Sequence, residues 1–468
     1  MGKKKNKERT IDTRVRSGQA FARKINTRDR LLFEHRPRSF DCLGHLYNQL
    51  VARPLDSEQI RDSLAFKCST IEHQIVLLRD FILLNKEDLT KRYDFTRSLL
   101  DCLLRHHEVV YEGVMFGSSI NGLGFRDSDV DLRLRPLKRI GRKFEPLRYD
   151  RDHVERTLRN IAWQTTRCLP ALGEFVPSTR CPIAKLTFIS GYLQKHETLH
   201  EMINYDISLS SDNSLGSFNS KYLKFLCELE PKFHLLATVV RYWSKMHNLI
   251  VSGFLSSYAL VNMLIFFCQT LDEPLLPTVD QMRDVRLANE KRNVHPLKGL
   301  TQIEWHCLIS LVPSDYSRSK NIEPLSVLLL KFFEFYLNFP YSNHVITVRP
   351  GRALKQDEFV SSPQYHPRFP MKDYLNIQDP FDLKHNLTSG MTGEHLRLFL
   401  ITVRYSYEKL FRELTCNFIK PIELVSGNKI SSRKNDNTTK KSIKLDSRDW
   451  GLNALFVSLT PDEINRSL

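Results

Sequence analysis

The sequence has no apolar run that approaches the roughly 20 residues needed to cross a bilayer. Its longest apolar stretch, YALVNMLIFF at residues 258 to 267, is typical of a buried core helix. The opening MGKKKNKERT also lacks the apolar stretch of a secretory signal, and Asn6 breaks the myristoylation pattern that begins at Gly2. We therefore expect a chain with no membrane partner.

The nine cysteines form no Cys-x-x-Cys pair and no Cys/His pattern with zinc-ligand spacing. This lack excludes a zinc finger, and the odd number fits reduced, mostly buried thiols in an intracellular compartment. The N-terminal arginines suit a mitochondrial transit peptide, but Glu8 and Asp12 interrupt that pattern, and the lysine cluster suits nuclear import or RNA contact. We expect a cytoplasmic or nuclear location, with a mitochondrial one left open.

Acidic residues are fewer than basic ones, 53 against 69, so the formal net charge of the 468-residue chain is +16. Such an excess favours a polyanionic partner such as nucleic acid, although a solvated basic surface that only aids solubility would give the same count. With 41% hydrophobic residues the chain can bury a large core divided over two or three domains.

Hydrophobic spacing and polarity divide the chain into five regions. We expect a basic disordered arm at residues 1–40, a helical lead-in at 41–90 that packs on the central domain, a mixed α/β domain at 91–215, a helical domain at 216–416, and a polar linker and tail at 417–468.

Local patterns place elements within these regions. Helical spacing predicts two helices, at 57–84 and 95–104, and strand patterns cover 183–188, 202–209 and 343–349. The tail, with its apolar residues between 450 and 456, is predicted to dock back as a helix, after a disordered linker at 426–444.

The segment FGSSINGLGFRDSDVDLRL, residues 116 to 134, combines a Gly-Ser turn with a pair of acids. Because alternate side chains of a strand face opposite ways, Asp129 and Asp131 share one face, while Val130, Leu132 and Leu134 point into the core. In INYDISLS, residues 203 to 210, the same alternation puts Asp206 on an exposed face. If the two strands are neighbours, a third acid joins the pair.

Three converging carboxylates repel one another unless a cation lies among them, and hard oxygen ligands favour Mg²⁺ or Mn²⁺. Two such ions would activate an attacking hydroxyl and hold a triphosphate. Gly117 and Ser118 lie in a turn predicted to lead into a helix, whose free N–H groups suit phosphate. A DxD at a strand edge and a Gly-Ser turn are each common in unrelated folds, but their order and the exposed faces favour nucleotidyl transfer.

FGS, the paired acids and the later strand acid together resemble the DNA polymerase β-like nucleotidyltransferases. Within them the chain is similar, over residues 58 to 412, to the noncanonical poly(A) polymerases and terminal uridylyltransferases. The resemblance implies an α+β fold, in which a polymerase β-like nucleotidyltransferase domain is joined to a mostly helical central, PAP-associated domain. It also implies that the nucleotide and metal ions bind in the cleft between the two domains.

The same resemblance assigns roles to single residues. Asp129 and Asp131 would bind the metal ions together with Asp206, which would also activate the 3′-hydroxyl of the RNA primer. Contacts with the nucleotide would come from Phe116, Gly117 and Ser118 of the loop, from Asn219 to the ribose, from Arg241, Lys245 and Ser257 to the phosphates, and from Tyr258 stacked on the base. Arg241 departs from the lysine usual in the family but keeps the charge.

Four of these residues also have an ordinary structural explanation. Asn219 in FNSKYL would serve as a helix cap, Arg241 and Lys245 in VVRYWSKMHNLI would form a solvated helix face, and Tyr258 in LSSYALVNM would be a core residue.

The segment IQDPFDLKHN, residues 377 to 386, is similar to the family motif that closes over the base. Many uridylyltransferases carry a histidine at the place of His385 and an acid at that of Asp382, so the resemblance favours UTP. A histidine satisfied within its loop is the structural alternative. Poly(A) polymerases that use ATP, including mitochondrial ones, remain the alternative function.

The RNA 3′ end is the expected partner, bound through its phosphates without sequence reading. Arg133 and Arg135 share the face of the acids, and we predict that at least one contacts the RNA backbone; a salt bridge at the strand end is the alternative. No RRM signature is present, so target choice is expected from the basic arm or from protein partners. A catalytically inactive RNA-binding scaffold is the rival from another functional class.

Overall fold

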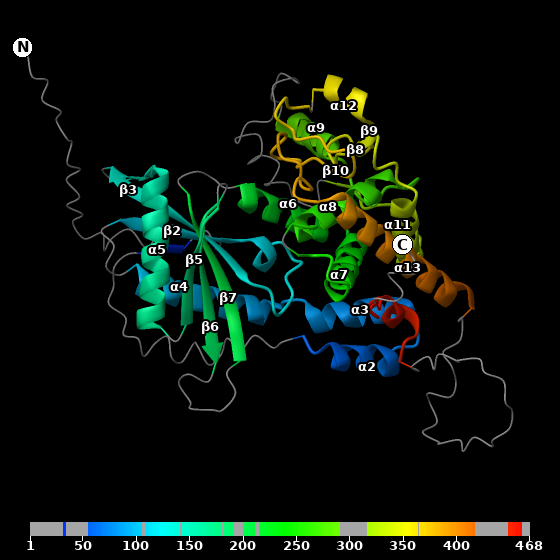
Figure 1. Cartoon of the computed structure of the whole chain (residues 1–468), viewed down its shortest axis with the longest axis horizontal. Coiled ribbons are helices and arrows are strands. Elements are labelled where there is room, and N and C mark those ends of the chain that lie inside the picture. The colour runs from blue at the N-terminus through cyan, green and yellow to red at the C-terminus, as the bar shows by residue number, and fades with distance from the viewer. Residues whose placement is uncertain are drawn as a thin grey trace, which may run out of the picture. The chain divides into compact units, whose positions relative to one another are not determined.

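The computed structural model describes residues 31–33, 55–104, 109–140, 143–169, 171–178, 181–190, 200–210, 215–251, 253–290, 316–363, 365–416 and 448–460. These residues belong to two compact units (Figure 1). The first, here called the sheet unit, comprises residues up to 53, 84–120 and 126–217. The second, the helical unit, comprises 54–83, 121–125 and 218–468. The fold is α+β.

The sheet unit is built on a seven-stranded sheet with the order β1-β2-β3-β7-β6-β5, in which β4 pairs with β3 outside this path. The strands are β1 (Leu31–Phe33), β2 (Val110–Phe116), β3 (Val130–Ile140), β4 (Lys143–Pro146), β5 (Ala171–Val176), β6 (Ile183–Ser190) and β7 (His200–Leu209). β3 and β7 run parallel, and the other pairs are antiparallel. The parallel pairing joins strands that are distant in the sequence, because β4, α5, β5 and β6 lie between β3 and β7 along the chain.

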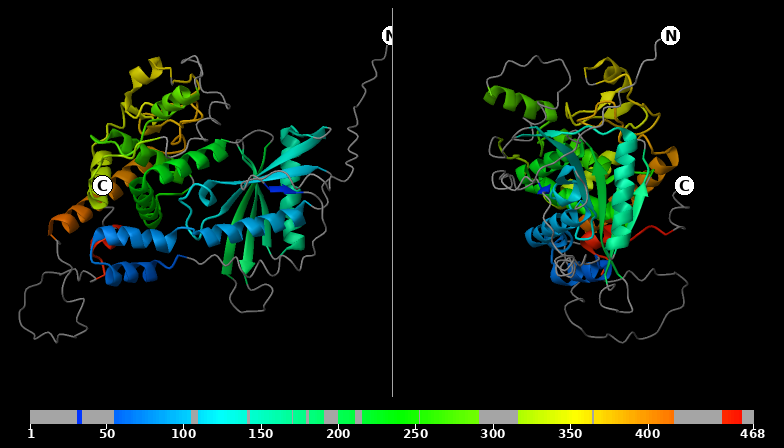
Figure 2. Two further views of the ribbon diagram at one scale, coloured as in Figure 1. Left: turned by 180° about the vertical axis from the view of Figure 1, so that it is seen from behind. Right: turned by 90° about the vertical axis from the view of Figure 1, so that its left-hand side faces the viewer.

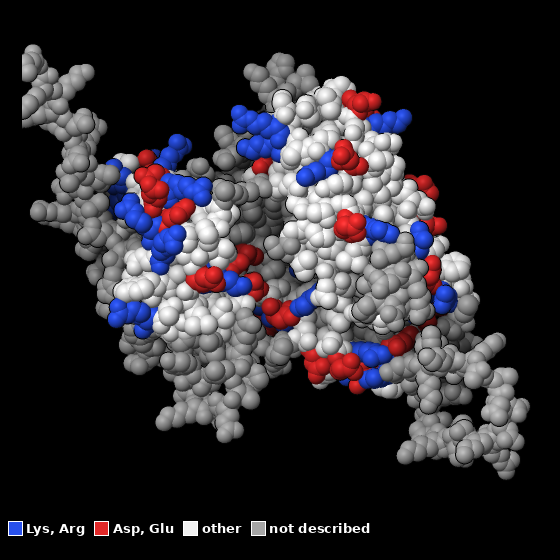
Figure 3. Space-filling model, in the orientation of Figure 1, with Lys and Arg blue, Asp and Glu red and all other residues white. Residues whose placement is uncertain are grey.

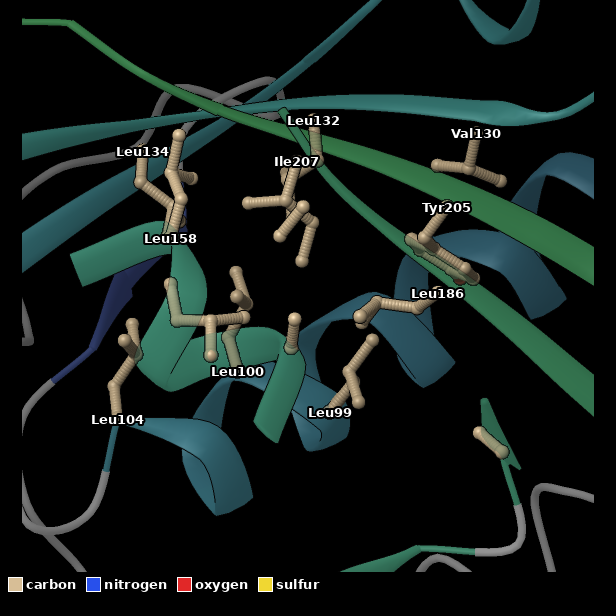
Figure 4. Packing of buried hydrophobic residues seen from close by; sticks show 14 of the residues in the cluster. Leu99, Leu100, Leu104, Val130, Leu132, Leu134, Leu158, Leu186, Tyr205 and Ile207 are labelled. Atoms are coloured by element: carbon tan, nitrogen blue, oxygen red, sulfur yellow. The ribbon is translucent and has the colours of Figure 1, made fainter. Parts of the chain in front are cut away.

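One face of this sheet packs on α4 (Lys86–Leu103) and α5 (Arg151–Cys168), as the close-up of the core shows (Figure 4). Leu132 and Leu134 of β3 and Ile207 of β7 meet the helix leucines there, all fully buried. The alternation in β3 and β7 is thereby confirmed: the apolar residues form the core, and the acids occupy the opposite face.

Local signals fix both covering helices. Asn85 and Asp88 form a reciprocal capping box at the start of α4, and the Asp150 side chain accepts from His153 N at the start of α5. Gly173 of β5 lets that strand approach α5, because a Cβ there would lie 2.7 Å from the carbonyl carbon of Ala162. The sheet and its two helices are seen from two further sides in Figure 2.

The helical unit contains α8, which is largely buried, and α7, which is buried over somewhat more than half of its residues. Its described elements are α2 (Ser57–Lys67), α3 (Ile71–Ile82), α6 (Leu215–Leu229), α7 (Pro231–Met246), α8 (Ser257–Thr270), α9 (Val279–Glu290), α11 (Leu325–Leu337), β8 (His344–Ile346), β9 (Leu354–Lys355), α12 (Gln356–Ser361), β10 (Asn376–Ile377), α13 (Gly393–Cys416) and the 3₁₀ helix η4 (Gly451–Leu455). Among the described helices, none has the length and apolar character required to cross a bilayer.

Several expectations differ from the structure. The region expected to hold one helix at 57–84 holds two, α2 and α3, because Thr70 caps a new helix by accepting from His73 N. Residues 31–33, expected in a disordered arm, form β1 against β2. The tail docks as a single 3₁₀ turn, with Leu452 and Leu455 fully buried. The linker predicted at 426–444 lies outside the described residues.

Candidate active site

The two strand acids lie side by side in the sheet. Asp131 of β3 and Asp206 of β7 are direct partners across the parallel pair, so their side chains project from the same face. Asp129 immediately precedes β3 and interacts electrostatically with both. The structure therefore brings together the three aspartates that the sequence singled out.

Electrostatics in this cluster disfavour three negative charges. Burial, followed by the charges of Asp206 and Asp129, raises the pKa of Asp131 to about 7, against a lowering hydrogen bond from the Ser118 backbone N–H. Burial and then Asp129 also raise the pKa of Asp206, while Lys185 opposes that shift. A like-charge cluster of this kind is stabilised by protons or by a bound cation.

The donor set fits a hard divalent cation. Oδ1 of Asp206 is buried and has no hydrogen-bond partner among the described residues, and the three side chains supply oxygen donors only. Across the described part of the chain, no group of three or more His, Cys, Asp or Glu side chains is positioned to hold a metal ion as it stands. The fit rests on the donors and their mutual repulsion, which a cation would relieve.

The glycine-serine turn is shaped around Asp131. Gly117 has φ +66°, and a Cβ at this position would lie 2.7 Å from Asp131 Cγ and closer still to Oδ2. Only glycine satisfies both the backbone conformation and the close approach. Ser118 Oγ donates to the Asp129 carbonyl at 3.3 Å, which ties the turn to the acids.

The predicted helix after this turn is not present. Residues Gly117–Ser119 form one 3₁₀ turn, and β3 is the next element along the described chain. The prediction that a helix N-terminus follows this turn is therefore wrong.

Two residues near the acids were missed by sequence reasoning. Buried Arg92 of α4 donates to Ser119 Oγ at 3.1 Å and to the Arg126 carbonyl at 3.0 Å, so it supports both ends of the loop. Lys185 of β6 pairs in register with Asp206 and brings a positive charge to the acidic face. Lys185 could have been found from the sequence, because alternation in the predicted strand at 183–188 places its side chain on the polar face. Nothing in the sequence indicated Arg92.

For Arg133 and Arg135, the structure favours the structural alternative over the predicted RNA contact. Arg133 is only 3% exposed, and Arg135 forms an ion pair with buried Glu112, its cross-strand partner on β2. The salt bridge considered as the alternative is the one observed for Arg135. Alternation had identified the correct face of β3, but this part of the face is buried.

In the helical unit, the basic residues of α7 are held in place by neighbours. The Arg241 side chain donates from Nε to Ser257 Oγ at 2.8 Å, and its guanidinium lies 4.6 Å from the Phe125 ring centre. Lys245 Nζ lies 5.9 Å from the same ring. Arg241, Ser257 and Lys245, predicted separately, therefore form one cluster around Phe125.

Tyr258 and His385 also approach a common residue, Asp379. Burial, and then the charge of Asp379, raises the pKa of Tyr258, whose hydroxyl is buried without a hydrogen-bond partner among the described residues. His385 Nδ1 lies 3.3 Å from Asp379 Oδ2, and Asp379 is 3% exposed.

The side-chain partner of His385 is thus Asp379, a residue that the sequence analysis did not single out. Asp379 Oδ1 accepts from the Asp382 backbone N–H at 3.2 Å, while the Asp382 carbonyl accepts from His385 N at 2.8 Å. Because of this turn, the carboxylate six residues before the histidine reaches the ring.

Asn219 lies in the second turn of α6 and is not a helix cap. Its Oδ1 is buried and has no partner among the described residues. A buried acceptor without a hydrogen bond lowers the stability of the folded state unless a bound group donates to it.

Two family models match the sequence. Residues 71–228 match the central palm domain of mitochondrial-like poly(A) RNA polymerase, and residues 324–385 match the Cid1 family poly A polymerase domain. The first match contains the three aspartates, and the second ends at His385.

Curated relatives are similar over parts of their length. The Speckle targeted PIP5K1A-regulated poly(A) polymerase of Danio rerio is 26% identical over 340 residues, which are 64% of this chain and 39% of the relative. The mitochondrial Poly(A) RNA polymerase of Homo sapiens is 26% identical over 399 residues, 77% of this chain and 58% of the relative. The chain spans less than two thirds of either relative.

Solved structures share the fold. The crystal structure of mtPAP in complex with UTP superposes with a TM-score of 0.62 at 22% identity and covers 86% of this chain and 75% of that one. A cytoplasmic RNA terminal U-transferase superposes with a TM-score of 0.54 at 21% identity, over 77% of this chain and 99% of that one.

Proposed function

The chain belongs to the family of noncanonical poly(A) polymerases and terminal uridylyltransferases, and from this premise we propose that it adds nucleotides to RNA 3′ ends without a template. The observation that carries the proposal is the pairing of Asp131 with Asp206 across β3 and β7, with Asp129 electrostatically coupled to both. A scaffold that only bound RNA would have no need of three mutually repelling carboxylates.

Asp129, Asp131 and Asp206 are the residues that would hold Mg²⁺ or Mn²⁺. Divalent ions bound there supply activation of the 3′-hydroxyl and charge neutralisation at the triphosphate. Gly117 and Ser118 would contact phosphate, with the Ser118 hydroxyl exchanging its 3.3 Å bond to the Asp129 carbonyl for one to a phosphate oxygen.

The helical unit would supply nucleotide binding. Arg241, held by Ser257 and Phe125, and Lys245 carry two positive charges that would suit a triphosphate. The unpartnered Oδ1 of Asn219 suits a ribose hydroxyl, which would satisfy it, and Tyr258 would stack on the base.

For the nucleotide, we propose UTP. His385 is held through Nδ1 by buried Asp379, so its ring orientation is fixed and Nε2 is the atom that a base edge would meet. An oriented polar group of this kind discriminates between bases by about 1–3 kcal/mol. ATP is the second candidate, because both relatives described above are named poly(A) polymerases. Their names refer to speckles and to mitochondria, and we propose an intracellular location.

The test is incubation of the purified chain and an unstructured RNA with each nucleoside triphosphate separately, beside Asp131→Ala. We expect extension with UTP preferred over ATP, and none by the variant. His385→Leu should lower the ratio of kcat/KM for UTP over ATP by about 5- to 150-fold. Extension by ATP alone would reverse the nucleotide assignment, and no incorporation of any nucleotide would favour the scaffold.

A further inference from the structure

The outer side of α5 carries a line of exposed side chains that the proposed chemistry does not use. Arg156, Arg159, Trp163 and Arg167 are spaced by three or four residues, so they share one face of the helix, and all are exposed. We call this set the α5 stripe. Trp163 is 56% exposed, although an indole of this size is normally largely buried.

Arginines lie against aromatic rings at both ends of the stripe. The Arg167 guanidinium lies 4.8 Å from the Trp163 ring centre, and that of Arg159 lies 4.0 Å from the ring centre of Phe175 on β5. Such pairs offer a flat surface for stacking directly beside a positive charge.

The charge of the stripe is not cancelled along its length. Glu155 faces Arg151 at 3.0 Å and Arg159 at 3.9 Å, near the helix N-terminus. Trp163 and Arg167 lie two to three turns beyond that acid. On the face drawn in Figure 3, basic side chains gather over the region where Figure 1 shows α5, with acidic ones among them.

We propose that the α5 stripe binds single-stranded RNA upstream of the 3′ end, with bases stacked on Trp163 and phosphates at Arg159 and Arg167. The inference rests on the proposed function, because it assumes an RNA substrate. Stacking on an aromatic side chain and contact with arginines give sequence-tolerant affinity, as an enzyme that adds to varied 3′ ends requires. Unlike Arg133, which is 3% exposed, the arginines of the stripe are exposed.

Geometry sets the length of RNA that would reach the stripe. α5 covers the sheet face opposite to Asp131 and Asp206. The RNA must therefore pass around β5, the strand at the edge of the sheet. The path is on the order of 30 Å from strand spacings and the helix diameter. At about 3.4 Å per stacked nucleotide this corresponds to roughly nine nucleotides. Only RNA longer than that should respond to the stripe.

The experiment measures equilibrium binding of 5′-labelled unstructured RNAs of about 6 and about 25 nucleotides, as a function of salt. Trp163→Ala and the double variant Arg159→Gln/Arg167→Gln are compared with wild type. The matched controls are Phe411→Ala and Arg404→Gln/Arg412→Gln, because α13 also carries an exposed aromatic residue between exposed arginines.

We expect Trp163→Ala to weaken binding of the long RNA by about 5- to 100-fold. The double variant should make the negative slope of log affinity against log salt shallower by about 1.4. Binding of the short RNA, and kcat on a short primer, should stay at the wild-type level. All variants change exposed side chains, and thermal melting checks that they remain folded.

The proposal is overturned if the variants bind the long RNA with unchanged affinity and salt slope. It is equally overturned if the α13 controls lose as much affinity, or if the wild-type chain does not bind the long RNA. The outcome is separable from that of the proposed function. A chain that incorporates no nucleotide but binds long RNA through the stripe contradicts only the enzyme assignment. An active chain whose RNA binding ignores the stripe contradicts only this inference.

Discussion

Replacing Gly117 by alanine tests whether the turn and Asp131 are fitted to each other. The added methyl group would lie 2.7 Å from Asp131 Cγ, where ordinary contacts lie at 3.4–4 Å, and closer still to Oδ2. The carboxylate must therefore move by on the order of 1 Å, a displacement that costs about 100-fold in rate at a catalytic centre. The positive φ of +66° adds a strain of about 1–2 kcal/mol to the folded state.

Gly122→Ala separates these two effects. Gly122 has φ +81°, so alanine suffers the same kind of backbone strain, but its Cβ would meet Cys227 at an ordinary 3.7 Å. We expect both variants to lose about 1–2 kcal/mol of unfolding free energy in urea titrations. Single-nucleotide incorporation should fall at least 100-fold in Gly117→Ala and less than about 5-fold in Gly122→Ala.

The comparison can refute the reasoning in two ways. If folded Gly117→Ala keeps a near wild-type kcat, the contact with Asp131 is not important for the reaction. If Gly122→Ala loses as much activity as Gly117→Ala, backbone strain alone explains the loss.

Two further substitutions test buried polar contacts. Arg135→Gln leaves the buried Glu112 carboxylate without this ion pair and should lower the free energy of unfolding in urea by about 3 kcal/mol. RNA affinity should stay unchanged. A loss of RNA affinity with normal stability would restore Arg135 as an RNA contact. Trp243→Phe removes the 2.7 Å hydrogen bond from Nε1 to Ser406 Oγ in the core, and calorimetry should show about 1–3 kcal/mol of destabilisation; no change would mean that the bond is dispensable.

The local part of the site could be read from the sequence, because strand alternation is local. It placed Asp129 and Asp131 on one face and Asp206 on an exposed face of a later strand. It did not determine that β3 and β7 are parallel neighbours with Asp131 opposite Asp206, because that pairing brings together distant segments. The resemblance to a family bridged this gap.

The errors also have physical reasons. Alternation says which face a side chain takes but not how deeply that face is covered, so buried Arg133 was assigned to RNA. Asp379 was not singled out, because only a hydrogen-bonded turn brings its carboxylate to the His385 ring. In both cases the deciding factor was three-dimensional packing around a short motif.

Binding of Mn²⁺, followed by electron paramagnetic resonance without nucleotide turnover, tests the central claim that aspartates from separate strands share one cation site. Asp131→Asn and Asp206→Asn should each weaken binding at least 10-fold, since each removes an oxygen ligand's charge. Glu174→Gln is the control, because Glu174 pairs in register with Lys185 on β6 and lies exposed near the edge of the sheet; it should bind like wild type. Wild-type Mn²⁺ affinity in Asp206→Asn would contradict the shared site.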